Sequence, residues 1–397
     1  RQRLRDALVV AEISVTLALL VGAGLLLRSF AHLRNADIGV NSENLSTMVI
    51  NLPETKYPTL AARRSYFNQL LDRARNTPGI TGAAISSEIP LQGGNNGYIK
   101  VDGEDDPALS KQLVGWNLIT PDYFRTLAIP LLEGRNFDSA DLDRTAAATQ
   151  KIFDLFKAAH GARVKMPSDL TLVAIIGQTT ARTFWKNQDP VGRSFRWNDV
   201  KVTVIGVVGD VKEYGIRANV MPQAYYPLPL ALGDGGYGHL TVKAAIPPAA
   251  VLSAMRGHVR SLDSSLAVSQ PQTMREIIAG DTRDISLQAF LLGAFAILAL
   301  LLAAVGLYGV MSYLVTQRTR EIGIRMALGA QQSNVLHLIM KQGSKLTLIG
   351  IVLGALASLA LTRSMSSLLY QVGPADPLTF ACVAAILLLV RQDVRFY

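Results

Sequence analysis

The densest group of charged side chains lies in residues 316–330, TQRTREIGIRMALGA, between two long apolar runs. Arg318, Arg320 and Arg325 surround Glu321 there. On a helix, positions 318, 321 and 325 would be three and four residues apart, so their charges could dock in line on a complementary groove. A solvated juxtamembrane segment that touches anionic lipid is the other interpretation. The stretch predicts a loop that two membrane helices present to one side of a bilayer.

Other residue patterns that support chemistry are absent from the sequence. Cys382 is the only cysteine, the histidines form no HExxH pattern, and there is no GxxxxGK[ST] phosphate loop. The acidic residues near position 104 lie beside Gly103 and Pro107, which favours a solvated turn over a metal site. We therefore expect no catalytic residue, no metal and no cofactor, and no ATP hydrolysis by this chain itself.

Composition points to a membrane protein with a large soluble part. Hydrophobic residues make up 49% of the chain and charged residues 17%, and the apolar runs gather at its two ends. The net charge of +9 comes from basic residues that often flank apolar spans. A nucleic-acid binder concentrates them on one face with aromatics nearby. The pattern fits membrane topology instead, so no nucleic-acid partner is expected.

The first domain, residues 1–30, is predicted to be a transmembrane helix. Its apolar run, residues 7–27, is close to the roughly 20 residues that span a bilayer. Arg1, Arg3 and Arg5 place the N-terminus in the cytoplasm. A signal peptide would have a shorter apolar core of about 7–15 residues and a small-residue cleavage site. Ala18 and Gly22, four residues apart, predict a face for close helix packing.

Glu12 is an acidic residue inside this first span. An intramembrane acid is a functional candidate by default. The interpretation that we favour is structural: Glu12 lies near the cytoplasmic end of the span and pairs with Lys341 or Lys345.

Residues 31–281 are predicted to form an extracytoplasmic α+β domain, expected in two lobes because it exceeds a typical single core. The segment 141–168 is basic and polar and is predicted to be a surface insertion. Within this domain the expected strands are 45–51, 80–87, 113–119, 170–176 and 202–208. The expected helices are 58–76, 178–185 and 247–262.

Residues 282–397 are predicted to be a membrane domain. Residues 282–315 contain no proline, and a continuous helix would be ~50 Å long against ~30 Å of hydrocarbon. We expect this helix to protrude as a stalk; a tilted span with a frayed end is the alternative. A cytoplasmic loop, 316–340, and a third helix, 346–362, follow, the latter with a GxxxG pair at Gly350 and Gly354. A fourth helix, 377–390, is too short by about five residues. The expected fold is thus a four-helix transmembrane bundle with an incomplete last helix.

Several motifs, in order along almost the whole chain, resemble one family. The segment QRTREIGIRMALGAQQSNV is similar to the cytoplasmic loop of MacB/FtsX-like ABC transporter permeases. NLITPDYFRTLAIPLLEGRNF, ARTFWKNQDPVGRSF and VIGVVGDVKEYGI resemble the MacB-like periplasmic core domain. VVAEISVTLALLVGAGLLLRSF resembles the first span of such a unit, in particular in the second half of an acidobacterial duplicated permease.

The resemblance implies four transmembrane helices in a bacterial plasma membrane, with the large outer domain between the first and second. It implies that the chain forms a pair with a second permease unit and that this pair works with cytoplasmic ABC ATPase subunits. The motion of the ATPase subunits would be transmitted to the outer domain for export or efflux. The alternative is a membrane-anchored sensor or adaptor without transport activity. The residues that would couple to the ATPase are Arg318, Arg320, Glu321, Ile322, Gly323, Arg325, Leu328 and Gly329.

Both ends of the sequence suggest a fragment. It begins without methionine, and residues 391–396 resemble the opening of another family unit. We expect a piece of a duplicated permease or a sequencing artefact. The segment 141–168 is also longer than expected for the family.

Overall fold

The computed structural model describes residues 2–34, 36–102, 106–159, 166–167, 169–186, 188–229, 236–327, 348–363, 372–373, 375–383 and 385. It divides into two compact units. The helical unit consists of Arg1–Ala36 and Thr282–Tyr397, and the sheet unit consists of Asp37–Asp281.

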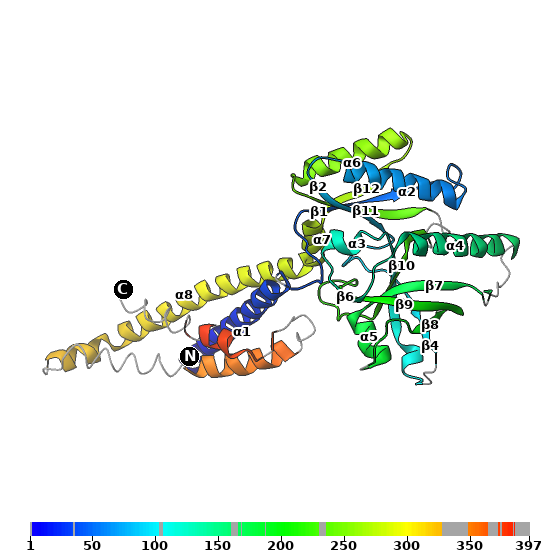
Figure 1. The fold of residues 1–397 in the computed structure, drawn as a ribbon. Helices are drawn as coiled ribbons and strands as arrows, with labels where there is room; N and C mark the ends of the chain where they lie inside the picture. Colours follow the sequence, from blue (N-terminus) through cyan, green and yellow to red (C-terminus); the bar gives the residue numbers. More distant parts are fainter. Residues whose placement is uncertain are drawn as a thin grey trace. The chain divides into compact units, whose positions relative to one another are not determined.

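The sheet unit is built on one mixed sheet with the strand order β12-β1-β11-β2-β5-β10-β7-β9-β8-β4, to which β3 and β6 add at β5 and β9 (Figure 1). Most neighbouring strands are antiparallel, but β10 pairs with β5, and β7 with β9, in parallel. The strands are β1 (Leu45–Asn51), β2 (Ile80–Ser86), β3 (Asn95–Tyr98), β4 (Lys100–Val101), β5 (Leu113–Ile119), β6 (Leu131–Gly134), β7 (Thr171–Gly177), β8 (Ser194–Trp197), β9 (Val200–Val208), β10 (Gln223–Pro227), β11 (Tyr237–Ala244) and β12 (Val268–Thr273).

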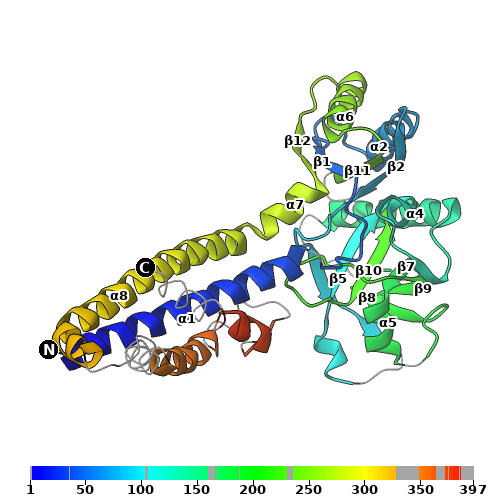
Figure 2. The same cartoon turned by 90° about the vertical axis from the view of Figure 1, so that its left-hand side faces the viewer.

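Helices cover this sheet in two places. Beside β1, β2 and β11, α2 and α6 lie next to each other (Figures 1 and 2). The α2 helix starts where the Thr59 hydroxyl accepts a hydrogen bond from the Ala62 N–H, and it buries Phe67, Leu70 and Leu71. The helices of this unit are α2 (Leu60–Arg75), α3 (Tyr123–Leu127), α4 (Ser139–Ala159), α5 (Gln178–Trp185), α6 (Pro248–Leu262) and α7 (Met274–Asp281), with a 3₁₀ turn, η1, at Leu109–Lys111.

The second cover, α4, corrects the expectation of a surface insertion at 141–168. Through residue 159 this segment is a helix that packs on β7 and β10. Thr145, Ala148 and Thr149 are buried on its inner side. Small and hydroxyl-bearing residues can lie against a sheet as closely as aliphatic ones, but they do not produce an apolar periodicity that marks a buried helix face.

The two halves of the sheet meet at a narrow junction between β2 and β5. These strands register at one residue pair, Ser86 with Ile119. Hydrogen bonds from the Ser87 N–H to the Leu118 carbonyl, 2.8 Å, and from the Thr120 N–H to the Ile85 carbonyl, 2.9 Å, extend the contact. Side chains add to it, because the Thr120 and Ser87 hydroxyls accept from the Ile85 and Leu118 N–H groups, each at 3.0 Å. We call this the β2–β5 junction.

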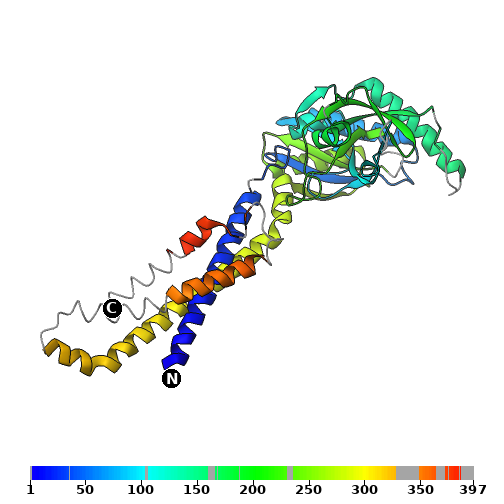
Figure 3. The same cartoon turned by 90° about the horizontal axis from the view of Figure 1, so that it is seen from below.

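In the helical unit, α1 (Gln2–Arg34) packs along α8 (Arg283–Ala327), and a further helix, Leu348–Arg363, contacts α1 on another side (Figure 3). Within the described ranges, Ala7–Arg34 and Arg283–Gly306 are the two segments long and apolar enough to cross a membrane. Many large apolar side chains on α8 are exposed, among them Phe290 at 71% and Val305 at 69%. Apolar surface of this extent is typical of contact with lipid or with another protein chain.

The α8 helix also corrects the expected boundary at residue 316. It continues without a break through Ala327, so residues 316–327 are helical rather than part of a loop. These twelve residues contain one glycine and no proline, and arginine, glutamate, methionine and alanine are strong helix formers. At the coarse level, the expected combination of apolar helices with a large domain of mixed helices and strands is confirmed. The four-helix bundle stays a prediction.

Candidate functional site

The charged residues expected to couple to a partner lie on the last turns of α8. Arg318, Glu321 and Arg325 occupy helical positions, three and four residues apart along α8. Arg320, Ile322 and Gly323 belong to the same turns, whereas Leu328 and Gly329 lie outside the described residues. Their assignment as a coupling element stays a prediction.

The two glycines of the predicted GxxxG pair face α1. A Cβ on Gly350 would lie 2.8 Å from the Ile13 side chain, and a Cβ on Gly354 would lie 2.9 Å from the Ser14 carbonyl oxygen. The Ser14 hydroxyl donates to the Gly350 carbonyl at 3.0 Å across the same contact. Absence of side chains at both positions lets the two backbones approach closely.

The small residues of α1 lie at its contact with α8 or near it. Gly22 is buried, and a Cβ there would lie 3.1 Å from Leu292 of α8, while Ala18 is half-buried. Two residues before Ala18, the Thr16 hydroxyl donates to the Ala299 carbonyl of α8 at 3.2 Å. The α1 helix is therefore packed on two sides, by α8 and by Leu348–Arg363.

Glu12 lies on the α8 side of α1. Its carboxylate packs against Gly306, where any larger residue would collide with it. Lys341 and Lys345, the partners expected for Glu12, lie outside the described residues, so that pairing stays a prediction.

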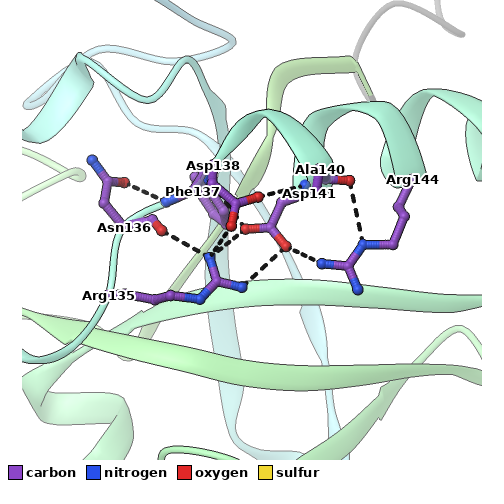
Figure 4. Close-up of polar contacts among 7 residues, drawn as sticks. All are labelled: Arg135, Asn136, Phe137, Asp138, Ala140, Asp141 and Arg144. Carbon is purple, nitrogen blue, oxygen red and sulfur yellow. Dashed lines mark hydrogen bonds and ion pairs between the residues drawn. The ribbon is translucent and has the colours of Figure 1, made fainter.

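A polar cluster at the start of α4 joins two arginines and two aspartates of the sheet unit (Figure 4). The Asp141 carboxylate is buried and accepts from both terminal guanidinium nitrogens of Arg135, Nη1 at 2.5 Å and Nη2 at 3.2 Å, and from Nη2 of Arg144 at 2.5 Å. It also accepts from the Asp138 N–H at 3.1 Å, and the Asp138 carboxylate accepts from the Asp141 N–H at 2.9 Å. This reciprocal pair of backbone bonds caps the helix.

Electrostatics fix the ionisation of Asp141. Burial by itself would raise the pKa of Asp141, but the hydrogen bonds from Arg135 and from the Asp138 N–H, together with the charges of Arg135 and Arg144, outweigh it. The net effect lowers the pKa below its usual value of 3.8. The cluster is thus a fixed ion pair, suited to anchoring α4 rather than to moving protons.

Within the described ranges, no three His, Cys, Asp or Glu side chains form a group that could hold a metal ion. Of the acidic residues expected in a turn, Asp102 binds Arg196 at 3.2 Å, and Glu104 and Asp105 lie outside the described residues.

His239 is a buried packing residue of the sheet unit. It is buried in β11, with its Nε2 2.7 Å from the Tyr237 hydroxyl. Burial lowers the pKa of His239 to about 4, from 6.5. The folded protein therefore holds His239 neutral in a pH range where the unfolded chain binds a proton.

We expect this difference to make stability fall with acidification. The contribution of His239 is complete above pH 6.5 and is lost as the pH falls from 6.5 to about 4, by roughly 3 kcal/mol in full. His239→Gln removes the titrating group. Thermal unfolding across this pH range should show a shallower loss for the variant than for the unchanged chain, and identical pH slopes would contradict the assignment.

Three acids that are buried among the described residues escaped sequence reasoning, Asp141, Glu213 and Asp263. For Asp141 the signal existed, since Asp138 and Asp141 stand three apart, as in a capping box. For Glu213, in the segment GDVKEYG, nothing local indicates burial.

Comparison with known proteins assigns both parts of the chain. Residues 7–261 match the model of the MacB-like periplasmic core domain, and residues 293–390 match the FtsX-like permease C-terminal domain. Among curated relatives, Macrolide export ATP-binding/permease protein MacB 2 of Aeromonas hydrophila is 27% identical over 246 residues, covering 60% of this chain and 34% of the relative. Probable syringafactin export ATP-binding/permease protein SyfD of Pseudomonas syringae is 26% identical over 246 residues, covering 60% and 33%.

The chain thus spans about a third of the length of these relatives. Of the solved structures, the periplasmic region of MacB from Actinobacillus actinomycetemcomitans aligns with 60% of this chain and 92% of its own, at 15% identity and a TM-score of 0.37. A TM-score this low supports no conclusion about function.

Proposed function

Since the chain belongs to the MacB/FtsX-like family of ABC transporter permeases, as its two domain matches show, we propose that it is the permease part of an export system. In this proposal a cytoplasmic ABC ATPase supplies the motion, and the helical unit transmits it to the sheet unit outside the membrane. The names of the relatives combine ATP-binding and permease functions in one protein, while we assign ATP hydrolysis here to a partner subunit.

The single observation that carries the proposal is the length of α8. Its 45 residues form one helix, which at ~1.5 Å per residue is roughly 67 Å long, about twice the ~30 Å hydrocarbon core. A rod of this length, with charged positions on its last turns, can span the bilayer and still extend beyond it. Because α1 packs along it, with Thr16 bound to Ala299, a displacement of one helix is expected to move both.

The exposed apolar residues of α8 support two further proposed partners, membrane lipid and a second permease unit. Phe290, Leu301 and Val305 need a nonpolar environment, which lipid or a second permease unit supplies. We therefore propose a multi-pass protein of a bacterial inner membrane that works in pairs, with its N-terminus in the cytoplasm and residues 31–281 outside.

Charge reversal on α8 tests the coupling. We expect Glu321→Arg and Arg325→Glu each to lower the stimulation of a co-purified ATPase at least tenfold, because each places a like charge in the docking contact. The measurement is ATP hydrolysis by candidate ATPases with and without the full chain in lipid nanodiscs.

Arg256→Glu is the matched control, since it makes the same charge change at an exposed position on α6. Stimulation that survives both reversals would disprove the coupling role of residues 318–329. Failure of every candidate ATPase to bind the unchanged chain would favour the alternative function, a membrane-anchored sensor or adaptor.

A further inference from the structure

A small cavity in the sheet unit contains two glutamates. It lies between the loop that precedes β10 and the segment that follows β2, and its volume is about 10 Å³, room for a single water-sized occupant. Glu213 and Glu88 both line it. All of its lining residues are described, and none of them is Lys, Arg or His. The protein itself therefore provides no positive charge at this place.

Glu213 is the deeper of the two acids. Its residue is 7% exposed, and no described group hydrogen-bonds to either of its carboxylate oxygens. An unpartnered buried carboxylate is costly and rare in folded proteins. Burial, and then the charge of Glu88, raises the pKa of Glu213 to about 8. Among the residues that line the cavity there is no counterion for its ionised form, so a bound cation would supply the missing charge partner.

The backbone holds Glu213 in this position. Its carbonyl accepts from the Gly93 N–H at 2.7 Å, and the Lys212 carbonyl accepts from the Leu91 N–H at 3.0 Å. The neighbouring cation is directed elsewhere, since the Lys212 ammonium donates to the Ile216 carbonyl at 2.6 Å. The segment that carries Glu88 and the loop that carries Glu213 are thus bound to each other along their main chains.

Neutral oxygens complete the lining. Asn117 holds the wall of the cavity in place, because its Oδ1 accepts from the Glu88 N–H and from the Ser87 hydroxyl, each at 3.1 Å, and its Nδ2 donates to the Glu88 carbonyl at 3.1 Å. Gln223 is fixed because its Oε1 accepts from the Tyr225 hydroxyl at 2.7 Å. Carboxylate, amide and hydroxyl oxygens are the ligands of hard cations, whereas transition metals favour imidazole or thiolate, which are absent from this lining.

We propose that this cavity binds one Ca²⁺ ion, with Glu213 and Glu88 as its charged ligands and with the side-chain oxygens of Gln223 and Tyr225 beside it. Calcium accepts irregular sets of oxygen ligands, while Mg²⁺ demands a near-octahedral shell and retains several waters, for which the cavity has no room. Glu88 lies toward the open side, where its Oε1 accepts from the exposed Asn95 side chain at 2.7 Å, so an ion would enter there. The site is independent of ATPase coupling.

Thermal unfolding of the purified full chain tests the proposal. After removal of metal with EDTA, Ca²⁺ is added from about 10 μM to about 10 mM, a range that includes the affinities of extracellular calcium sites. Because the ion binds the folded state, we expect the melting temperature to rise by several degrees with the logarithm of the Ca²⁺ concentration. The rise should be smaller when Mg²⁺ is added instead. Direct binding of radioactive calcium is the second readout.

Glu213→Gln should abolish both the rise and the bound calcium, and Glu88→Gln should weaken binding at least tenfold. Glu43→Gln is the matched control, because Glu43 is an exposed acid of the same unit. An unchanged response in Glu213→Gln would overturn the site, since calcium would then bind elsewhere. So would the absence of any response in the unchanged chain, which would leave a water as the occupant. A larger rise with Mg²⁺ would overturn the choice of calcium.

Discussion

Replacement of Gly354 by leucine is expected to destroy the packing of the helical unit. A Cβ at this position would lie 2.9 Å from the Ser14 carbonyl oxygen and 3.0 Å from the Leu17 Cβ, and both distances are too short for two carbon or oxygen atoms without a shift. Helix Leu348–Arg363 would have to move away from α1, which would also break the bond from the Ser14 hydroxyl to the Gly350 carbonyl. Overpacking of this kind costs about 1–3 kcal/mol, and the lost hydrogen bond adds about 1 kcal/mol.

The measurement is the yield of monodisperse protein in detergent, followed by its thermal unfolding. Gly293→Leu is the matched control, because Gly293 lies on α8 with no atom within 4 Å of a Cβ placed there. It adds the same side chain in the same unit. Comparable losses in Gly354→Leu and Gly293→Leu would show that the α1 contact is not the cause.

The second large effect is expected for Asp141→Ala in the sheet unit. The change leaves Arg135 and Arg144 without their shared acceptor and removes the cap on the Asp138 N–H. Loss of one partner of a buried ion pair costs about 3–5 kcal/mol, but Arg135 and Arg144 are 46% and 64% exposed and regain water. We therefore expect a loss of roughly 2–3 kcal/mol in the free energy of unfolding.

Asp143→Ala provides the control for this loss. Asp143 pairs with Arg64 at 2.7 Å but is 67% exposed, so its removal should change stability by less than about 1 kcal/mol.

Acid provides a second test of the role of Asp141. Because the pKa of Asp141 is lowered in the folded protein, its contribution is present above 3.8 and is lost as the pH falls below that value. The difference between Asp141→Ala and the unchanged chain should stay constant from neutral pH to about 4 and shrink in stronger acid. A difference that shrinks already between pH 7 and 5 would contradict this account.

Sequence reasoning succeeded where local rules and burial agree. Residues 178–185 were predicted as a helix and are α5, and the predicted strands at 45–51 and 113–119 are β1 and β5. It failed for residues 316–327, where charge suggested a loop although helix propensity was high. It failed for 141–159 because small buried residues mimic a polar surface.

The candidate sites divide in the same way. Glycine spacing alone indicates a packing role for Gly350 and Gly354, because a four-residue repeat is a local property of the chain. The cavity at Glu213 depends on Asn117 and Gln223, about a hundred residues apart, and no local pattern predicts which distant side chains will enclose an acid.

The β2–β5 junction has a mechanical consequence. A sheet bends most easily where its neighbouring strands are paired over the shortest length. Since β2 and β5 register at one residue pair, we expect the sheet to be least stiff at Ser86 and Ile119. The hydroxyls of Ser87 and Thr120 hold the two strands together there, because each accepts a hydrogen bond from the opposite strand. Each of these hydrogen bonds can be replaced by one to water when the strands separate. A force on either half of the sheet would therefore bend the sheet at the β2–β5 junction, while the strands on both sides keep their register.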